Sequence, residues 1–133
     1  MRVDIVIIGG AGHIGLPLGL LFANKGKKVI LYDKDKINVK KINNLKMPFM
    51  EEGGEKLLKK NIKRIFATTN KKFVRLAKTI IVCVGTPVKS SKPDLGFFFK
   101  MFREIKDHIE PKKLLIIRSS VYPGTCLKIQ NFL

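Results

Sequence analysis

The sequence predicts an α/β fold, a doubly wound parallel sheet with helices on both faces. Three observations predict it. Residues 3–9 form a continuous apolar run that ends in glycine, which is typical of a strand buried on both faces. A glycine-rich turn follows this run and opens an apolar helix. Strand-like and helix-like segments then alternate along the chain, which implies right-handed crossovers between parallel strands.

The first half of the chain predicts two further strands and three helices. Apolar residues at helical spacing indicate each helix, and a glycine or proline stands near several of the expected ends. The predicted elements are a helix over about 14–24, a strand over 28–33, a lysine-rich helix with the apolar stripe Val39, Ile42 and Leu45, a helix over 51–61 and a strand over 65–68.

The second half of the chain continues the alternation. The predicted elements are a brief helix over 71–77, a strand over 79–84, a helix with the apolar stripe Phe98, Met101, Phe102, Ile105 and Ile109, a strand over 113–120 and the start of a helix after the turn at 122–124. Phe97, Phe98, Phe99 and Phe102 could form a stacking platform for bases. Their helical spacing favours a place in the core instead.

Composition and charge limit the classes of function. The formal net charge of +17 fits nucleic acid, an anionic membrane surface or anionic small molecules, but no nucleic-acid-binding motif accompanies it, so no nucleic-acid partner is expected. No apolar run approaches the ~18 residues of a membrane helix, so no membrane partner is expected either. Without a signal sequence and with two cysteines, Cys83 and Cys126, the chain is expected to be cytoplasmic. Neither cysteine has metal-ligand spacing, so no metal site is predicted.

The strongest motif is Gly10-Ala11-Gly12-His13-Ile14-Gly15, a G-x-G-x-x-G turn between the first strand and the first helix. In this context it is the fingerprint of a Rossmann-like dinucleotide site. Gly10 is expected to permit the tight turn, Gly12 the approach of the pyrophosphate, and Gly15 close packing of helix on strand. His13 and Ile14 occupy the variable positions and are expected to bind the cofactor. His13 is expected to line the pocket, with its backbone N–H more important than its ring. The alternative is an ordinary strand-to-helix turn.

Asp33 ends the second strand at about the distance that the fingerprint requires. Its carboxylate is expected to accept hydrogen bonds from the adenosine ribose and to repel a 2′-phosphate, so the predicted cofactor is NAD rather than NADP. Lys34 and Lys36 weaken that preference. The alternative for Asp33 is a helix cap or a solvated turn residue.

Two later segments also end strands at the edge where open α/β sheets bind ligands. The first is Val84-Gly85-Thr86-Pro87, and the second runs from Ser119 to Thr125. The hydroxyl of Thr86 is therefore expected to face the cofactor. Both segments could instead be plain turns.

Together these motifs resemble the UDP-glucose/GDP-mannose dehydrogenase family, whose members oxidise a nucleotide-sugar alcohol to a carboxylate with NAD. The similar segments are Gly10 to Pro17, Pro48 to Gly53, Val84 to Pro87 with Pro93-Asp94, and Ser119 to Thr125, whose Y-P-G-T wording resembles the UDP-N-acetylmannosamine dehydrogenase branch. The resemblance implies that Val84, Thr86 and Ser120 belong to the cofactor site. Ser120 stands where the family usually has threonine.

The resemblance also implies what residues 1–133 do not contain. They are expected to form one NAD-binding domain, C-terminally truncated relative to the family, without the central and UDP-sugar-binding domains. Arg118 stands where many members have glutamate, and the family's G-x-C-x-P-K-D stretch with its catalytic cysteine has no counterpart here. No catalytic residue is therefore predicted, and Cys126 lies outside any Cys-His arrangement.

The functional hypothesis is the cofactor domain of an NAD-dependent UDP-sugar 6-dehydrogenase, which oxidises the sugar C6 alcohol to a uronic acid. Alone, the chain is expected to be inactive on its UDP-sugar substrate, and a homo-oligomer or a partner chain with the catalytic domain is expected. Apolar residues Ile129, Phe132 and Leu133 are expected to be uncovered, which favours association. The alternative is a non-catalytic NAD-binding or redox-sensing module.

Overall fold

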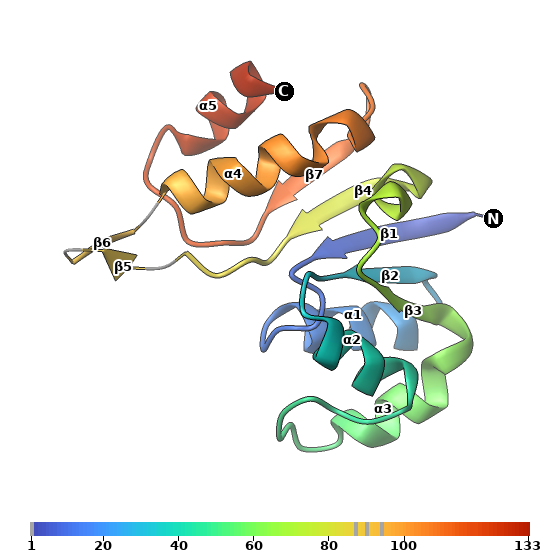
Figure 1. Ribbon diagram of the computed structural model, residues 1–133. Helices are drawn as coiled ribbons and strands as arrows, with labels where there is room; N and C mark the ends of the chain where they lie inside the picture. Colours follow the sequence, from blue (N-terminus) through green and yellow to red (C-terminus); the bar gives the residue numbers. More distant parts are fainter. Residues whose placement is uncertain (1, 87, 90, 94) are drawn as a thin grey trace.

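A five-stranded, wholly parallel sheet forms the centre of the molecule. The computed structural model describes residues 2–86, 88–89, 91–93 and 95–133. The strand order is β3-β2-β1-β4-β7, as Figure 1 shows. The strands are β1 (Val3–Ile8), β2 (Val29–Tyr32), β3 (Ile65–Thr68), β4 (Ala77–Val82) and β7 (Leu114–Ile117). This arrangement confirms the predicted fold class.

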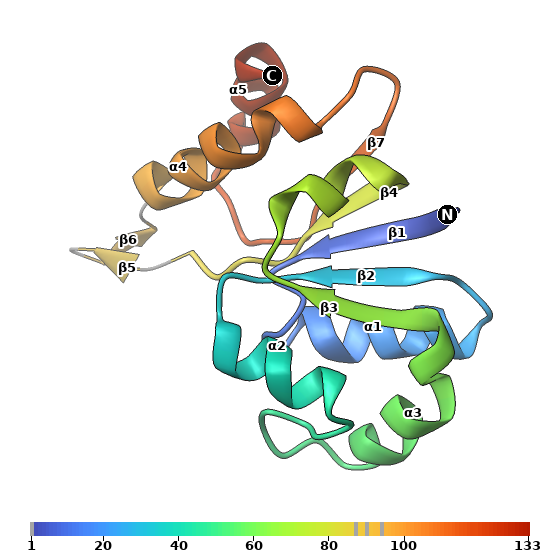
Figure 2. The ribbon, with the colours of Figure 1, turned by 45° about the vertical axis from the view of Figure 1, so that its right-hand side comes forward.

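Helices cover both faces of the sheet (Figure 2). On one face lie α1 (Gly15–Asn24), α2 (Lys36–Asn43) and α3 (Gly54–Asn61), and on the other α4 (Leu95–Ile105) and α5 (Thr125–Phe132). Short 3-10 turns lie at Ile62–Arg64, Lys71–Leu76 and Lys106–His108. The strands β5 (Val88–Lys89) and β6 (Lys92–Pro93) form a small antiparallel hairpin that the sequence did not predict.

Alternate residues of β1 belong to two different cores. Ile5 and Ile7 pack in the core with α1, whereas Val6 and Ile8 pack in the core with α4. Because successive side chains of a strand point to opposite faces, a strand between two helical layers must be apolar throughout. The unbroken apolar run at the start of the sequence is therefore a consequence of this sandwich.

Two strands end earlier than the sequence predicts. β4 stops at Val82 and not at residue 84, and β7 stops at Ile117 and not at residue 120. The last parallel pairs are Ile8 with Val82 and Val82 with Ile117. The ladder therefore ends where β1 ends, although the apolar or hydroxyl-bearing sequence continues. The residues beyond it form loops at the carboxyl edge of the sheet.

Three helices are also shorter than predicted. α4 ends at Ile105, so Ile109 of the predicted stripe lies outside it. α2 ends at Asn43, so Leu45 lies outside it with a φ of 63°. α3 begins at Gly54 and not at residue 51, because Gly53 precedes it in the left-handed region, with a φ of 72°. At the other end of α2, the side chain of Asp35 caps the helix by accepting a hydrogen bond from the N–H of Asn38 at 3.0 Å.

The expectation about the apolar residues of the last helix was largely wrong. Ile129 is buried, and Phe132 packs against the core that α4 shares. Leu133 is 39% exposed. Leu127 of the same helix is 61% exposed, and on β7 Leu114 and Ile116 point away from α4 and are 59% and 39% exposed. Within the described part of the chain, none of the helices is both long and apolar enough to span a bilayer.

Candidate functional site

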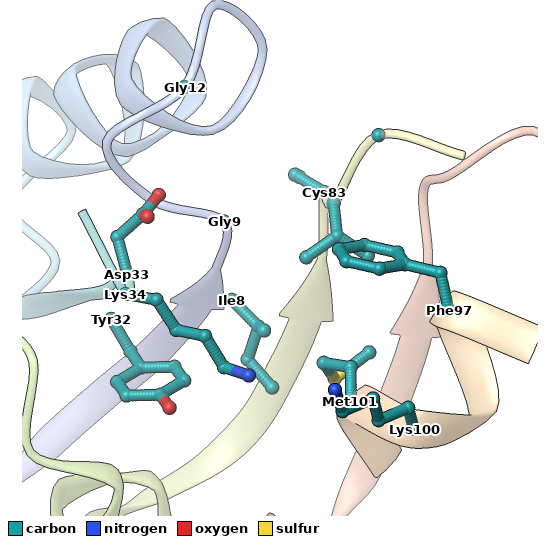
Figure 3. Close-up of a pocket in the computed structure, with 12 residues that line it drawn as sticks. Ile8, Gly9, Gly12, Tyr32, Asp33, Lys34, Cys83, Phe97, Lys100 and Met101 are labelled. Atoms are coloured by element: carbon teal, nitrogen blue, oxygen red, sulfur yellow. The ribbon is translucent and has the colours of Figure 1, made fainter. Parts of the chain in front are cut away.

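A cavity of about 410 Å³ opens at the carboxyl edge of the sheet, between the ends of β1 and β4. Here the order of the strands reverses, because the chain runs outward from β1 to β2 and β3 and then returns to add β4 and β7 on the other side. Such a switch point is where open α/β sheets bind ligands. The lining residues are Ile8, Gly9, Gly12, Tyr32, Asp33, Lys34, Cys83, Val84, Gly85, Phe97, Lys100 and Met101, most of them visible in Figure 3.

The glycine turn is built by three separate steric requirements. Gly9, not Gly10, adopts the left-handed conformation, with a φ of 78°, so the tight turn uses the glycine before the motif. A Cβ on Gly10 would lie 2.7 Å from the Cα of Leu31, and one on Gly15 would lie 2.2 Å from the carbonyl oxygen of Gly9. Gly10 and Gly15 are therefore required by the protein's own packing.

Gly12 differs from these neighbours. Its φ is not positive, and an added Cβ would meet only the carbonyl oxygen of Gly9, at 3.4 Å. The protein itself leaves room for a methyl group at this position, which lines the cavity. A requirement for glycine at position 12 must therefore come from a ligand that approaches the backbone.

The first turn of α1 offers free N–H groups beside Gly12. No side chain caps this helix, and its first turn carries no acidic residue. Among the described residues, the N–H groups of His13 and Ile14 have no hydrogen-bond partner. Unpaired N–H groups and the positive end of the helix dipole attract anions such as phosphate.

The side chains of His13 and Ile14 do not line the cavity, although His13 was expected to do so. Both are exposed, and the ring of His13 stacks on that of Phe49 with their centroids 4.1 Å apart. Phe49 belongs to the segment between α2 and α3. At these two positions the groups available to a ligand in the cavity are therefore the backbone N–H groups.

Asp33 lines the cavity directly after β2. Its Oδ2 accepts a hydrogen bond from the N–H of Ala11 and its Oδ1 one from the N–H of Asp35, both at 3.0 Å. These bonds fix the carboxylate while leaving each oxygen able to accept another hydrogen bond. Since Asp35 is the cap of α2, the alternative of Asp33 as helix cap does not hold.

The loops after β4 and β7 are joined by hydroxyl groups. Thr86 Oγ1 donates to the carbonyl oxygen of Ser120 at 3.1 Å, and Ser119 Oγ donates to that of Val84 at 2.6 Å. The structure thus brings together the three expected residues Val84, Thr86 and Ser120, but of these only Val84 lines the cavity, and Ser120 is exposed. Pro87 and Asp94, which belong to the motifs, lie outside the described residues.

The sequence analysis missed the other wall of the cavity. Lys100 and Met101 come from α4, as does Phe97, which was expected in the core but is 47% exposed. Lys34 follows Asp33. Lys34 forms an ion pair with Glu104 of α4, and this hydrogen-bonded ammonium lowers the pKa of the Glu104 carboxyl. Spacing along the chain gives no sign of this pair, since its two residues meet only when α4 packs against the sheet.

Cys83 falls within the strand predicted over 79–84, but the structure places it outside β4. Because β4 ends at Val82, Cys83 lies just beyond it, half-buried in the cavity wall. Partial burial raises the pKa of its thiol, with Arg118 acting in the opposite direction. Cys126 is exposed on α5 and borders a different cavity, with Ile129. A raised pKa makes the Cys83 thiol a weaker nucleophile.

Comparison with known proteins agrees with this architecture. Residues 2–133 match the NAD binding domain of the UDP-glucose/GDP-mannose dehydrogenase family. The UDP-N-acetyl-D-mannosamine dehydrogenase of Pyrococcus horikoshii is 30% identical over all of this chain and 32% of its own length. NAD, the cofactor expected from the glycine turn and Asp33, is confirmed as the cofactor of this kind of domain.

Two solved structures share the fold closely. A UDP-D-ManNAc dehydrogenase from Pyrococcus horikoshii superposes with a TM-score of 0.89 at 30% identity, covering 99% of this chain and 31% of that one. A GDP-mannose dehydrogenase from Pseudomonas aeruginosa gives 0.85 at 33% identity, covering 97% and 30%. The chain spans about a third of the length of these relatives. It belongs to the UDP-glucose/GDP-mannose dehydrogenase family, whose NAD binding domain is the part that residues 2–133 match.

Proposed function

We propose that the cavity between β1 and β4 binds NAD, and that residues 1–133 form the cofactor domain of a nucleotide-sugar 6-dehydrogenase, which oxidises the sugar C6 alcohol to a uronic acid. The observation that carries the proposal is Gly12. A Cβ at this position would make no close contact with the protein, so a ligand can approach the backbone of Gly12 directly. A dinucleotide pyrophosphate is the ligand for which such a turn is made.

Along the carboxyl edge of the sheet, successive groups of residues are suited to bind successive parts of NAD. The N–H groups of His13, Ile14 and Gly15 at the start of α1 would hold the phosphates. Asp33 would accept hydrogen bonds from the adenosine ribose, because its oxygens have acceptor capacity beyond the N–H groups of Ala11 and Asp35. NAD supplies the chemistry by accepting a hydride from the substrate alcohol.

The nicotinamide end would lie toward the loops after β4 and β7. Val84 lines the cavity there, and the hydrogen bond from Thr86 to Ser120 positions the two loops against each other. The hydroxyl oxygen of Thr86 keeps its acceptor capacity while it donates, so it can still bind a ligand N–H. The role of these residues is to orient the cofactor, not to react.

The substrate is proposed to be a UDP-sugar, with UDP-N-acetylmannosamine as the first to test. The Y-P-G-T segment that ends in Thr125 and the 30% identity to a UDP-N-acetyl-D-mannosamine dehydrogenase support this choice. The sugar site and the catalytic cysteine are proposed to come from a further domain or a partner chain. Both cysteines are free, which fits the reducing cytoplasm proposed as the location.

Calorimetric titration of residues 1–133 with NAD and NADH tests the proposal. Binding to the folded state also raises the melting temperature, since ligand at a hundredfold excess over Kd stabilises by about 2.7 kcal/mol. Gly12→Ala is expected to keep the melting temperature of the free wild-type chain but to lose NAD binding, because its methyl group occupies the approach path. A folded wild-type chain that binds neither NAD nor NADH at millimolar concentration would overturn the proposal.

Gly15→Ala serves as the comparison for Gly12→Ala. The two changes add the same methyl group within one turn, but that of Gly15 collides with the backbone of Gly9. Gly15→Ala should therefore melt well below the wild type in the absence of any ligand. If Gly12→Ala instead destabilises the free chain as much as Gly15→Ala does, the glycine at 12 serves packing and not the cofactor.

A further inference from the structure

Lys34 reaches across the cavity from the end of β2 toward α4. Figure 3 shows its side chain running beside Tyr32 and ending near Ile8, below the carboxylate of Asp33. Its ammonium forms the ion pair with Glu104, the residue one turn beyond Lys100 on α4. The pair therefore joins the residue that follows Asp33 to α4.

We propose that Glu104 is a specificity-determining residue, which holds the ammonium of Lys34 and so prevents this lysine from attracting the 2′-phosphate of NADP. The inference rests on the proposed NAD site, in which Asp33 holds the adenosine ribose. It assigns the choice between NAD and NADP to a pair of side chains from opposite walls, in addition to Asp33.

The position of Lys34 makes this control necessary. A cation beside the ribose-binding position is the chemistry by which such sites accept a 2′-phosphate. Lys34 directly follows Asp33 and lines the cavity, so a free ammonium would offset the repulsion that the Asp33 carboxylate exerts. Glu104 neutralises that ammonium and fixes its place near α4.

The other charges near Glu104 support the same conclusion. Lys34, Lys100 and Lys71 all lower the pKa of the Glu104 carboxyl, with the hydrogen bond from Lys34 as the largest effect. The carboxylate thus stays ionised among three lysines. Removing its charge would leave Lys34 and Lys100 facing the cavity without this counter-charge.

The test uses two small probes that differ only by the 2′-phosphate, 5′-AMP and 2′,5′-ADP. The ratio of their dissociation constants reports the 2′-phosphate alone and requires no turnover. Glu104→Gln keeps the shape of the side chain and removes its charge. Because the ion pair is partly exposed, we expect a modest effect. The Glu104→Gln variant should shift the ratio of dissociation constants toward 2′,5′-ADP by about two- to fivefold relative to wild type. The gain should shrink at high salt.

Two further variants distinguish an effect of Lys34 from an effect of the protein's net charge. Glu55→Gln makes the same change of net charge on α3, at an exposed position on the opposite face of the sheet, and should leave the ratio at the wild-type value. The double variant Lys34→Met with Glu104→Gln should return the ratio to wild type or below. NAD titrations and melting curves of each variant confirm that the site and the fold persist.

Each outcome bears on one statement. An unchanged ratio in Glu104→Gln overturns the inference while NAD binding still upholds the proposed function. A gain that survives in the double variant also overturns it, because Lys34 is then not responsible. Failure of the wild-type chain to bind NAD, 5′-AMP and 2′,5′-ADP overturns the proposed function, and the inference with it.

Discussion

The carboxylate of Asp33 accepts a hydrogen bond from the backbone N–H of Ala11, with 3.0 Å between the two atoms. This bond ties the residue after β2 to the glycine turn after β1. Asp33 therefore has a structural task as well as the binding task proposed for it, and a variant at this position must be tested for both.

Asp33→Asn is expected to weaken NAD binding and to narrow the gap between NAD and NADP. The amide loses the charge that repels a 2′-phosphate, and its single oxygen cannot accept from both Ala11 and Asp35. We also expect a loss of stability of about 1–2 kcal/mol. Titration with both dinucleotides and chemical denaturation measure the two effects.

Asp4→Asn is the matched control for Asp33→Asn. The Oδ2 of Asp4 also accepts a hydrogen bond from a backbone N–H, that of Lys28 at 2.8 Å, but at the opposite end of the sheet. This control should change stability without changing the preference between NAD and NADP. An equal fall in both affinities in Asp33→Asn would mean that Asp33 only organises the loop.

Two neighbouring phenylalanines should respond to truncation in opposite ways. Phe98 is fully buried between α4 and the sheet, whereas Phe97 is 47% exposed and lines the cavity. Phe98→Ala should cost about 3–5 kcal/mol of stability. Phe97→Ala should cost far less and should instead weaken NAD binding about two- to tenfold. Denaturation curves measure the stability of both variants, and titrations measure their affinity for NAD. An unaltered NAD affinity in Phe97→Ala would show that Phe97 does not contribute to the NAD site.

His108 predicts a dependence of stability on pH. Burial lowers the pKa of this histidine below 6.5, and the nearby Arg75 and Lys71 lower it further, with Asp107 acting the other way. Arg75 donates to Nδ1 of His108 at 3.0 Å, an arrangement that requires the neutral ring. Since the unfolded chain binds a proton more readily, stability should be full above about pH 6.5 and should fall as the pH is lowered below it.

Melting temperatures between about pH 7.5 and 5.5 measure this effect of His108. His108→Gln removes the titration and should flatten the slope. His13→Gln changes the same residue type at an exposed position in the glycine turn and should keep the wild-type slope. If His108→Gln and wild type lose stability in parallel, the acid sensitivity arises elsewhere.

The polypeptide of residues 1–133 is expected to show no turnover with NAD and UDP-N-acetylmannosamine or UDP-glucose. Hydride transfer requires the sugar carbon about 3–3.5 Å from the nicotinamide, and oxidation beyond the aldehyde requires an activated thiolate. Cys83 has a raised thiol pKa, and Cys126 borders another cavity. Formation of NADH that Cys126→Ser abolishes and Cys83→Ser does not would contradict this prediction.

The glycine turn could be predicted from sequence because its determinants are local. Gly10 meets a steric demand from the neighbouring strand and Gly15 one from the backbone of Gly9, whereas Gly12 meets none from the protein. The strand ends could not be predicted as well, since β4 stops where β1 stops offering hydrogen bonds and not where the apolar run stops. That limit depends on a strand far away in the sequence.

The cavity wall formed by α4 could not be predicted from the sequence for a related reason. The stripe of Phe98 and Phe102 correctly predicted the buried face of α4. Which of its other residues would face the cavity depends on where α4 lies along the sheet. The ion pair between Lys34 and Glu104 and the place of Phe97 follow from that packing, and no spacing rule encodes them.

The strand order also has a consequence for how the chain folds. β1 precedes the other strands of the sheet along the chain, yet it lies in the middle of the sheet, where Val3 pairs with Ala77. The strands β2 and β3 and the helices α1 to α3 all precede β4 along the chain. Until α4 arrives, the other face of β1, with Val6 and Ile8, stays open to water and to other chains. Non-local pairing of this kind slows folding and leaves strand edges exposed until it is complete.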